Sequence, residues 1–336
     1  MCGKGVDQTM RTPQRWQVLA LELKERHCMG NEENMGFELG KSFFTDKINF
    51  DVWGALARPA VPVVQQKKIE PGDDRDDDYP WRRSLGIFDI LSNELVDMVI
   101  DNVSTSNDND LVALGLTCQG FWELVVQRIQ TRYIKNAAPW AGKKIALLGS
   151  WSTSLPESFS QNNLASNIIE DAEWPITRHL SRTLFCLIES EGTALRTTKT
   201  REASLMNTVD QYLAQCRIPE WRWKEMKEQL KCPELFPLDR EWVLRNLTTR
   251  EYVSASYTVG VIRATKIRLV DALLSKIGWS DNLSWSDQKF DEDGWAGQWA
   301  GHCFDIVTKE VQVKEGGSEA WKNVTDDVVR QAEMLR

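Results

Sequence analysis

Apolar residues recur at helical spacing between residues 92 and 135 of the chain. Ser92 can cap a helix over about residues 93–101, because its side-chain oxygen can accept from a free amide of the first turn. Asp108 can cap a second helix through about Leu116, and a third helix begins near Gln119. The residues expected to face inward are Leu95, Met98 and Val99, then Leu111 and Leu114, then Phe121, Leu124, Val125, Ile129 and Tyr133.

The first 80 residues have a weaker pattern. Four apolar residues are spaced as on one side of a helix: Trp16, Leu19, Ala20 and Leu23. Residues 15–26 are therefore predicted to form a short amphipathic helix. Residues 70–80 (EPGDDRDDDYP) combine two prolines, a glycine and a run of acidic groups, which cannot bury enough apolar surface to order a backbone. We interpret this run as a linker that closes a variable N-terminal region, residues 1–80.

The pattern changes again in the last third of the chain. An apolar stripe up to Ile277 has helical spacing, whereas the Trp-, Gly- and Asp-rich run from Trp279 to Ile306 is typical of short strands and turns. The expected fold class is α+β. A helical domain over residues 81–150 would be followed by a mixed α/β, tryptophan-rich domain over residues 151–336.

Composition and charge narrow the classes of function. The chain has 336 residues with 41 basic and 49 acidic groups, so its net charge is 41 − 49 = −8. This balance argues against a general nucleic-acid binder, and no apolar window approaches the ~18 residues of a membrane span. Seven dispersed cysteines and the lack of an apolar stretch near the start indicate reduced thiols in the cytoplasm, the nucleus or both. We expect neither nucleic acid nor a membrane as partner.

The helical block carries a one-sided charge. Residues 84–127 contain seven acidic groups and no basic group. Three short helices bury little apolar surface, so the block must be stabilised by packing against another part of its own chain or against another protein. Clustered leucines surrounded by acidic side chains are typical of a surface that docks a partner protein. Amphipathic stripes, however, more often face the internal core of the same protein.

Two stretches of the block resemble an F-box: IFDILSNELVDMVI (residues 87–100) and DLVALGLTCQGFW (residues 110–122). F-box proteins are substrate adaptors of SCF-type ubiquitin ligases, and their three helices bind a Skp-type linker that connects to a cullin. The resemblance implies that the linker-binding residues or their supporting core are Leu91, Ser92, Leu95, Val99, Leu111, Leu114, Cys118 and Phe121. Two positions depart from the family pattern: Ser92 replaces the usual proline, whose ring contacts the linker, and Gln119-Gly120 replaces the usual basic residue.

Further stretches are similar to a family of fungal F-box proteins: APWAGKKI (residues 138–145), LRNLTTREYV (residues 244–253) and WAGQWAGHCFDI (residues 295–306). The resemblance implies that the C-terminal domain recruits a protein substrate, which it does not name. The candidate recognition residues are Trp279, Trp285, Trp295 and Trp299. Tryptophan is enriched at binding hot spots, but it is more often part of a core.

Motifs for catalysis or metal binding are incomplete, and we predict no catalytic residue, metal or cofactor. Residues 36–42 resemble a phosphate loop but have three residues between the glycines instead of four. Residues 289–300 resemble a calcium loop without its final glutamate. Two alternatives to the adaptor stay open: an F-box-like module outside any ligase, and an enzyme in the C-terminal domain suggested by the adjacent His302 and Cys303.

Overall fold

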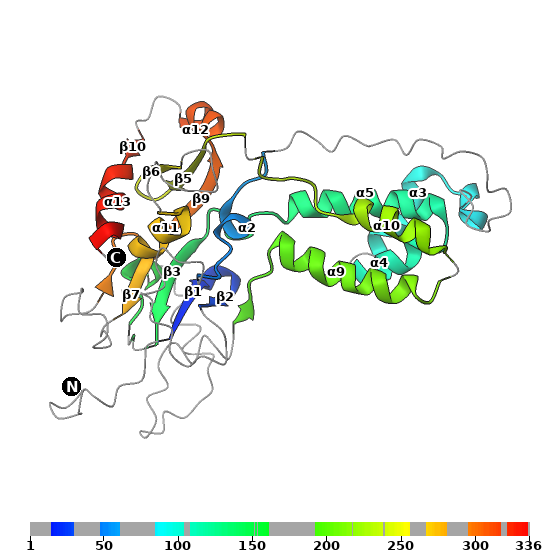
Figure 1. Cartoon of the computed structure of the whole chain (residues 1–336), viewed down its shortest axis with the longest axis horizontal. Coiled ribbons are helices and arrows are strands. Elements are labelled where there is room, and N and C mark those ends of the chain that lie inside the picture. The colour runs from blue at the N-terminus through cyan, green and yellow to red at the C-terminus, as the bar shows by residue number, and fades with distance from the viewer. Residues whose placement is uncertain are drawn as a thin grey trace, which may run out of the picture. The chain divides into compact units, whose positions relative to one another are not determined.

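The computed structural model describes residues 15–29, 48–60, 85–103, 108–150, 152, 154–160, 192–216, 218–237, 239–255, 267–280, 295–316 and 321–334. The described chain has an α+β fold, as predicted. It divides into two compact units, each made of separate stretches of sequence. A sheet unit comprises residues 1–58, 138–195 and 238–336, and a helical unit comprises residues 59–137 and 196–237 (Figure 1).

The described strands of the sheet unit form one mixed, ten-stranded sheet. The order along the sheet is β10-β6-β5-β9-β3-β1-β2-β4, while β7 pairs with β3 and β8 pairs with β7. The strands are β1 (Trp16–Ala20), β2 (Glu25–Cys28), β3 (Lys144–Gly149), β4 (Thr193–Ala194), β5 (Trp242–Asn246), β6 (Glu251–Ala255), β7 (Gly278–Ser280), β8 (Trp295–Ala296), β9 (His302–Thr308) and β10 (Lys322–Asn323). The expectation of short strands between Trp279 and Ile306 is thus confirmed.

The amphipathic helix predicted over residues 15–26 is wrong. This stretch forms β1, a 3-10 turn η2 (Leu21–Leu23) and β2, and β1 pairs with β2 and β3. All five side chains of β1 are buried, including the polar Gln17. A strand buried on both faces has no alternation of polar and apolar residues, so its spacing can imitate one side of a helix.

Five described helices belong to the sheet unit: α2 (Val52–Leu56), α6 (Glu157–Ser160), α11 (Leu269–Ile277), α12 (Lys309–Gly316) and α13 (Thr325–Met334). The predicted helical stripe up to Ile277 is α11, and all nine of its residues are buried. Its first turn is held by Asp271, whose carboxylate accepts from the backbone amide of Arg268 at 3.1 Å. α11 contacts β3 and α13, and α12 contacts β5 and β9.

The helical unit contains the three predicted helices, which are α3 (Asn93–Val103), α4 (Asp108–Gly115) and α5 (Gln119–Lys135). Two later helices, α9 (Thr198–Leu213) and α10 (Glu220–Leu230), complete the unit. α4 and α5 pack on each other, α9 contacts α4, and α10 contacts α5 and α9. The three-helix block is therefore stabilised on one side by packing against α9 and α10 of the same chain.

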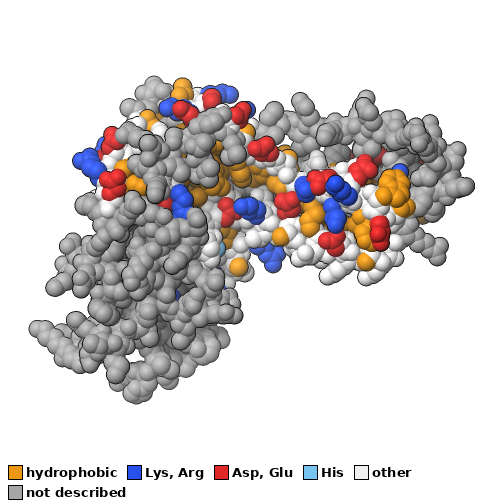
Figure 2. Space-filling view, in the orientation of Figure 1, with side chains coloured by type: hydrophobic (Ala, Val, Ile, Leu, Met, Phe, Trp, Pro, Cys, Tyr) orange, Lys and Arg blue, Asp and Glu red, His pale blue; other side chains and the backbone are white. Residues whose placement is uncertain are grey.

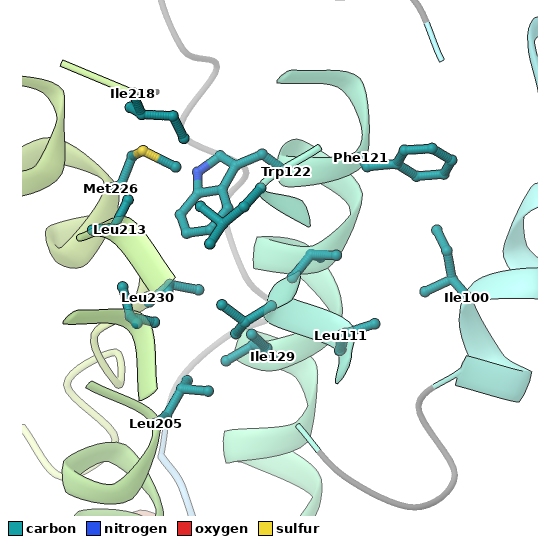
Figure 3. Packing of buried hydrophobic residues seen from close by; sticks show 14 of the residues in the cluster. Ile100, Leu111, Phe121, Trp122, Ile129, Leu205, Leu213, Ile218, Met226 and Leu230 are labelled. Atoms are coloured by element: carbon teal, nitrogen blue, oxygen red, sulfur yellow. The ribbon is translucent and has the colours of Figure 1, made fainter. Parts of the chain in front are cut away.

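One apolar core joins these five helices, and Figure 3 shows part of it. Trp122 of α5 lies near Leu213, Ile218 and Met226, which come from the later stretch of sequence. Its indole nitrogen donates to Gln229 Oε1 at 2.6 Å, so its single polar atom is satisfied inside the core. This single side chain connects α5 with Gln229 of α10, more than a hundred residues later in the sequence.

The inward sides of α4 and α5 agree with the prediction at Leu111, Phe121, Val125, Ile129 and Tyr133, all buried. Leu114 and Leu124 are half-buried. The inward side of α3 was predicted wrongly, because α3 buries Val96 and Ile100 and leaves Leu95 and Met98 exposed and Val99 half-buried. α3 carries two apolar stripes, and only the packing onto the neighbouring helices selects between them.

The division of the chain differs from the expected boundaries at residues 80 and 150. Residues 16–28 supply two strands of the sheet unit, and residues 138–149 return to that unit after α5. Residues 196–237 belong to the helical unit and not to the sheet unit that follows them. The expected linker, residues 70–80, lies outside the described residues.

Candidate partner-binding face

A group of exposed apolar side chains lies at the start of the helical block. Ile87 and Ile90 of the 3-10 helix η3 (Gly86–Ile90) are 80% and 87% exposed, and Leu95 and Met98 of α3 are 46% and 59% exposed. We call these four residues the α3 face. They are four of the six large exposed hydrophobics of the described chain, and they fall within twelve residues. An exposed apolar cluster of this kind marks a binding surface more often than scattered single residues do.

The helical period explains how α3 can have both a buried and an exposed apolar side. Val96 and Ile100 are four residues apart and face the core, whereas Leu95 and Met98 are three residues apart and share the exposed side. Leu91 lies four residues before Leu95 and packs partly against the core. The face therefore borders the core without being covered by α4, α5, α9 or α10.

Ser92 begins α3 as predicted. Its carbonyl accepts from the amides of Leu95 at 3.0 Å and Val96 at 3.1 Å, the first hydrogen bonds of the helix. A hydrogen bond with the Ser92 side chain lowers the pKa of the exposed Glu94 carboxyl. Ser92 itself is exposed, so its side chain lies beside the α3 face and not beneath it.

The charge around the face is more balanced than the sequence suggests. Arg128 of α5 pairs with Asp97 at 2.9 Å and with Asp101 at 3.4 Å, and Arg132 pairs with Asp108. Three of the seven acidic groups of residues 84–127 are thus matched by arginines that follow in the sequence. Figure 2 shows acidic and basic side chains side by side on this unit. These are surface pairs, which contribute little stability.

The eight residues expected to form the linker site are divided by the structure. Ser92 and Leu95 are exposed, and Leu91, Val99, Leu114 and Cys118 are half-buried. Leu111 and Phe121 are core residues, 0% and 3% exposed. Only the exposed members and their half-buried neighbours can meet a partner. Sequence reasoning missed Ile87 and Ile90, although they share a three-residue spacing, and it placed Met98 inward.

The four tryptophans proposed for substrate recognition do not share one described surface. Trp299 is buried and its indole nitrogen donates to Glu251 Oε2 at 2.9 Å. Trp279 is half-buried and donates to the carbonyl of Ser154 at 3.0 Å. Trp285 lies outside the described residues, and Trp295 is described only as part of β8. Trp299 therefore serves the core of the sheet unit.

The adjacent His302 and Cys303 do not form a nucleophile–base pair. They are consecutive in β9, so their side chains point to opposite faces of the sheet. His302 Nδ1 lies 2.9 Å from Asn246 Nδ2, and Asn246 Oδ1 accepts from the backbone amides of Thr248 and Thr249. The amide group of Asn246 must therefore donate to His302, which places the imidazole proton on Nε2. Burial raises the pKa of the Cys303 thiol, the opposite of what a nucleophile needs.

The other sequence motifs add no site. The loop over residues 36–42 and His179 lie outside the described residues, as do residues 289–294 of the loop that resembles a calcium site. No cluster of three histidine, cysteine or carboxylate side chains in the described part could hold a metal ion. None of the described helices is both long and apolar enough to span a membrane.

Comparison of the chain with family models, with curated proteins and with solved structures found no match. The face on α3 and η3 is therefore interpreted from its own geometry and from the sequence patterns described above.

Proposed function

We propose that the chain is a substrate-recruiting adaptor of an SCF-type ubiquitin ligase. In this role the α3 face docks a Skp-type linker, the linker connects to a cullin, and the sheet unit recruits a protein substrate that is still to be identified. Such an adaptor would work in the cytoplasm or the nucleus. Its contribution to the reaction is effective concentration, since tethering a substrate near a ubiquitin-loaded enzyme needs no chemistry by this chain.

The observation that carries the proposal is the exposure of Ile87, Ile90, Leu95 and Met98 beside a core that α9 and α10 already complete. The four side chains are not members of that core, whose neighbours from the same stretch, Phe88 and Leu91, are only partly buried. Large apolar groups held exposed on an ordered helix are a typical docking surface for a second helical protein. They fall in the stretch whose sequence resembles the first helix of an F-box.

The test is binding of a purified Skp-type linker to the full chain and to a variant with Leu95→Asp and Met98→Asp. Both side chains are exposed, so the variant should fold normally by circular dichroism, whereas Phe121→Asp would disrupt the core. Two charges in an apolar contact should weaken binding at least ~100-fold, since each 1.4 kcal/mol is tenfold. Val313→Asp is the matched control, because Val313 is 72% exposed on α12 of the sheet unit. Equal linker binding by both variants and the wild type would refute the proposal.

A second candidate is an F-box-like interaction module that does not assemble into a ligase. Ser92 favours it, because the resemblance implies a proline at this position. Proline is well suited to the start of a helix, and the exposed Ser92 side chain leaves room for it. If Ser92→Pro produces a large gain in linker binding from an undetectable baseline, the module interpretation is preferred. If the wild type binds and Ser92→Pro changes little, the adaptor proposal is supported.

A further inference from the structure

The 3-10 helix η3 has two apolar sides with different surroundings. A 3-10 helix has three residues per turn, so residues i and i+3 lie on the same side. Leu85, Phe88 and Leu91, in and beside η3, follow this spacing and pack partly against the core of the helical unit. Ile87 and Ile90 have the same spacing on another side, and both are exposed. One side of η3 is therefore attached to the core, and another is presented to the outside.

Phe88 makes the central contact of the attached side. Its ring packs edge-on against Phe121 of α5, with ring centroids 5.4 Å apart and an angle of 77° between the planes. Phe121 is buried, and Figure 3 shows its ring on the side of α5 away from Leu213 and Leu230. Edge-to-face pairs at this distance are favourable beyond the area that they bury. Phe88 thus anchors η3 to a buried side chain of α5.

The backbone of η3 is too short to be ordered by itself. It has five residues, and isolated short helices are not stable in water. The Leu91 amide donates to the Phe88 carbonyl at 3.0 Å, and the Leu85 amide donates to the Asp89 carboxylate at 3.0 Å. These bonds close the turns only while the side chains hold η3 in place. The order of η3 therefore depends on its anchors, of which Phe88 is the middle one.

We propose that Phe88 is a positioning residue, which holds η3 against α5 so that Ile87 and Ile90 are displayed in a fixed arrangement to the linker. This role rests on the proposed function, because it assumes that the α3 face docks the linker. A segment that is ordered in advance loses less conformational entropy on binding than one that orders at the interface. Phe88 acts through η3, since its ring is turned to Phe121.

Native-state hydrogen exchange of the full chain tests the positioning without any partner. The reporter is the Leu91 amide, and Phe88→Ala should speed its exchange at least ~tenfold, because most of the order of η3 is lost. Phe88→Leu keeps an apolar side chain and should lose less protection. The control is the Leu116 amide, which donates to the Val112 carbonyl at 3.0 Å and should exchange as in the wild type if α4 is intact.

Binding of a purified Skp-type linker separates the positioning residue from the contact residues. Phe88→Ala should raise the Kd at least ~threefold, because the apparent affinity falls with the population of the binding-competent state. The double variant Ile87→Ser with Ile90→Ser should also weaken binding but leave the exchange of the Leu91 amide unchanged. A purely structural role of Phe88 would change the exchange without changing the Kd.

Each outcome decides a separate step. Exchange of the Leu91 amide in Phe88→Ala within about twofold of the wild type would overturn the positioning role, whatever the linker does. Faster exchange with an unchanged Kd would overturn the role of η3 in docking. If the wild type binds no linker, the proposed function fails, and the exchange of the Leu91 amide still decides whether Phe88 positions η3.

Discussion

The pair formed by Arg245 of β5 and Asp305 of β9 allows the most quantitative prediction. The two residues are 2% and 0% exposed, and they form two parallel hydrogen bonds of 2.8 Å and 2.7 Å. Arg245 also pairs with Glu315 of α12 at 2.9 Å, and Arg58 pairs with Asp305 at 2.8 Å. The pair therefore lies at the centre of a network that joins β5, β9 and α12.

Replacing only Arg245 by methionine leaves a buried carboxylate with Arg58 as its remaining cation. Removing one partner of a buried ion pair costs about 3–5 kcal/mol. Arg58 is 45% exposed and still pairs with Asp305 in the variant, so we expect a loss of stability at the lower end of this range, about 3 kcal/mol. Since 1.4 kcal/mol changes an equilibrium constant tenfold, this loss corresponds to a roughly hundredfold increase in the equilibrium constant for opening of the sheet.

Native-state hydrogen exchange of the amides of β5 and β9 measures this opening directly. The matched control is the double variant Arg245→Met with Asp305→Leu, which removes both charges and should recover most of the lost protection. Exchange in Arg245→Met within about threefold of the wild type, or a double variant less protected than the single one, would refute the reasoning.

Two further predictions concern the sheet unit. Burial holds the pKa of His302 below 6.5, so the neutral form that accepts from Asn246 is favoured by folding. Its contribution is complete above pH 6.5 and is lost as the pH falls through the lowered value, so the urea midpoint should fall between pH 7 and pH 5; a flat profile would contradict this. Gly301→Ala should destabilise more than Gly142→Ala. Both have positive φ, 76° and 75°, but a Cβ at Gly301 would lie 1.9 Å from Ser158 Oγ, whereas the space at Gly142 is open. Equal thermal midpoints of the two alanine variants would show that the clash is relieved.

The helices that could be predicted are those specified by neighbours in sequence. α3 and α4 begin and end, and α5 begins, within about two residues of the expected positions, because caps and helical spacing are local signals. Local sequence does not determine which side of α3 is buried. Val96 and Leu95 are equally apolar, and only contact with distant residues decides which of them is covered.

The sheet shows the limit of local patterns more strongly. β1 pairs with β3, so that Leu19 lies opposite Ala146, more than a hundred residues later in the chain. The spacing of residues 15–26 carries no information about this distant strand, and the same spacing is compatible with a helix. The contribution of α9 and α10 to the helical unit was missed for the same reason, since the bond from Trp122 to Gln229 is a long-range contact.

The packing of the helical unit also restricts how an adaptor of this kind could work. α9 contacts α4, and α10 contacts α5. Leu111 and Phe121, which the F-box resemblance would offer to a linker, are buried in the shared core, where the Phe121 ring packs edge-on against Phe88 of η3. A partner that needs those two residues would have to displace part of the unit's own core. A partner that uses the α3 face meets side chains that are already exposed and displaces nothing. The linker proposed here must therefore bind η3 and α3, and its affinity should respond to Met98 more strongly than to any conservative change at Leu111 that preserves the core.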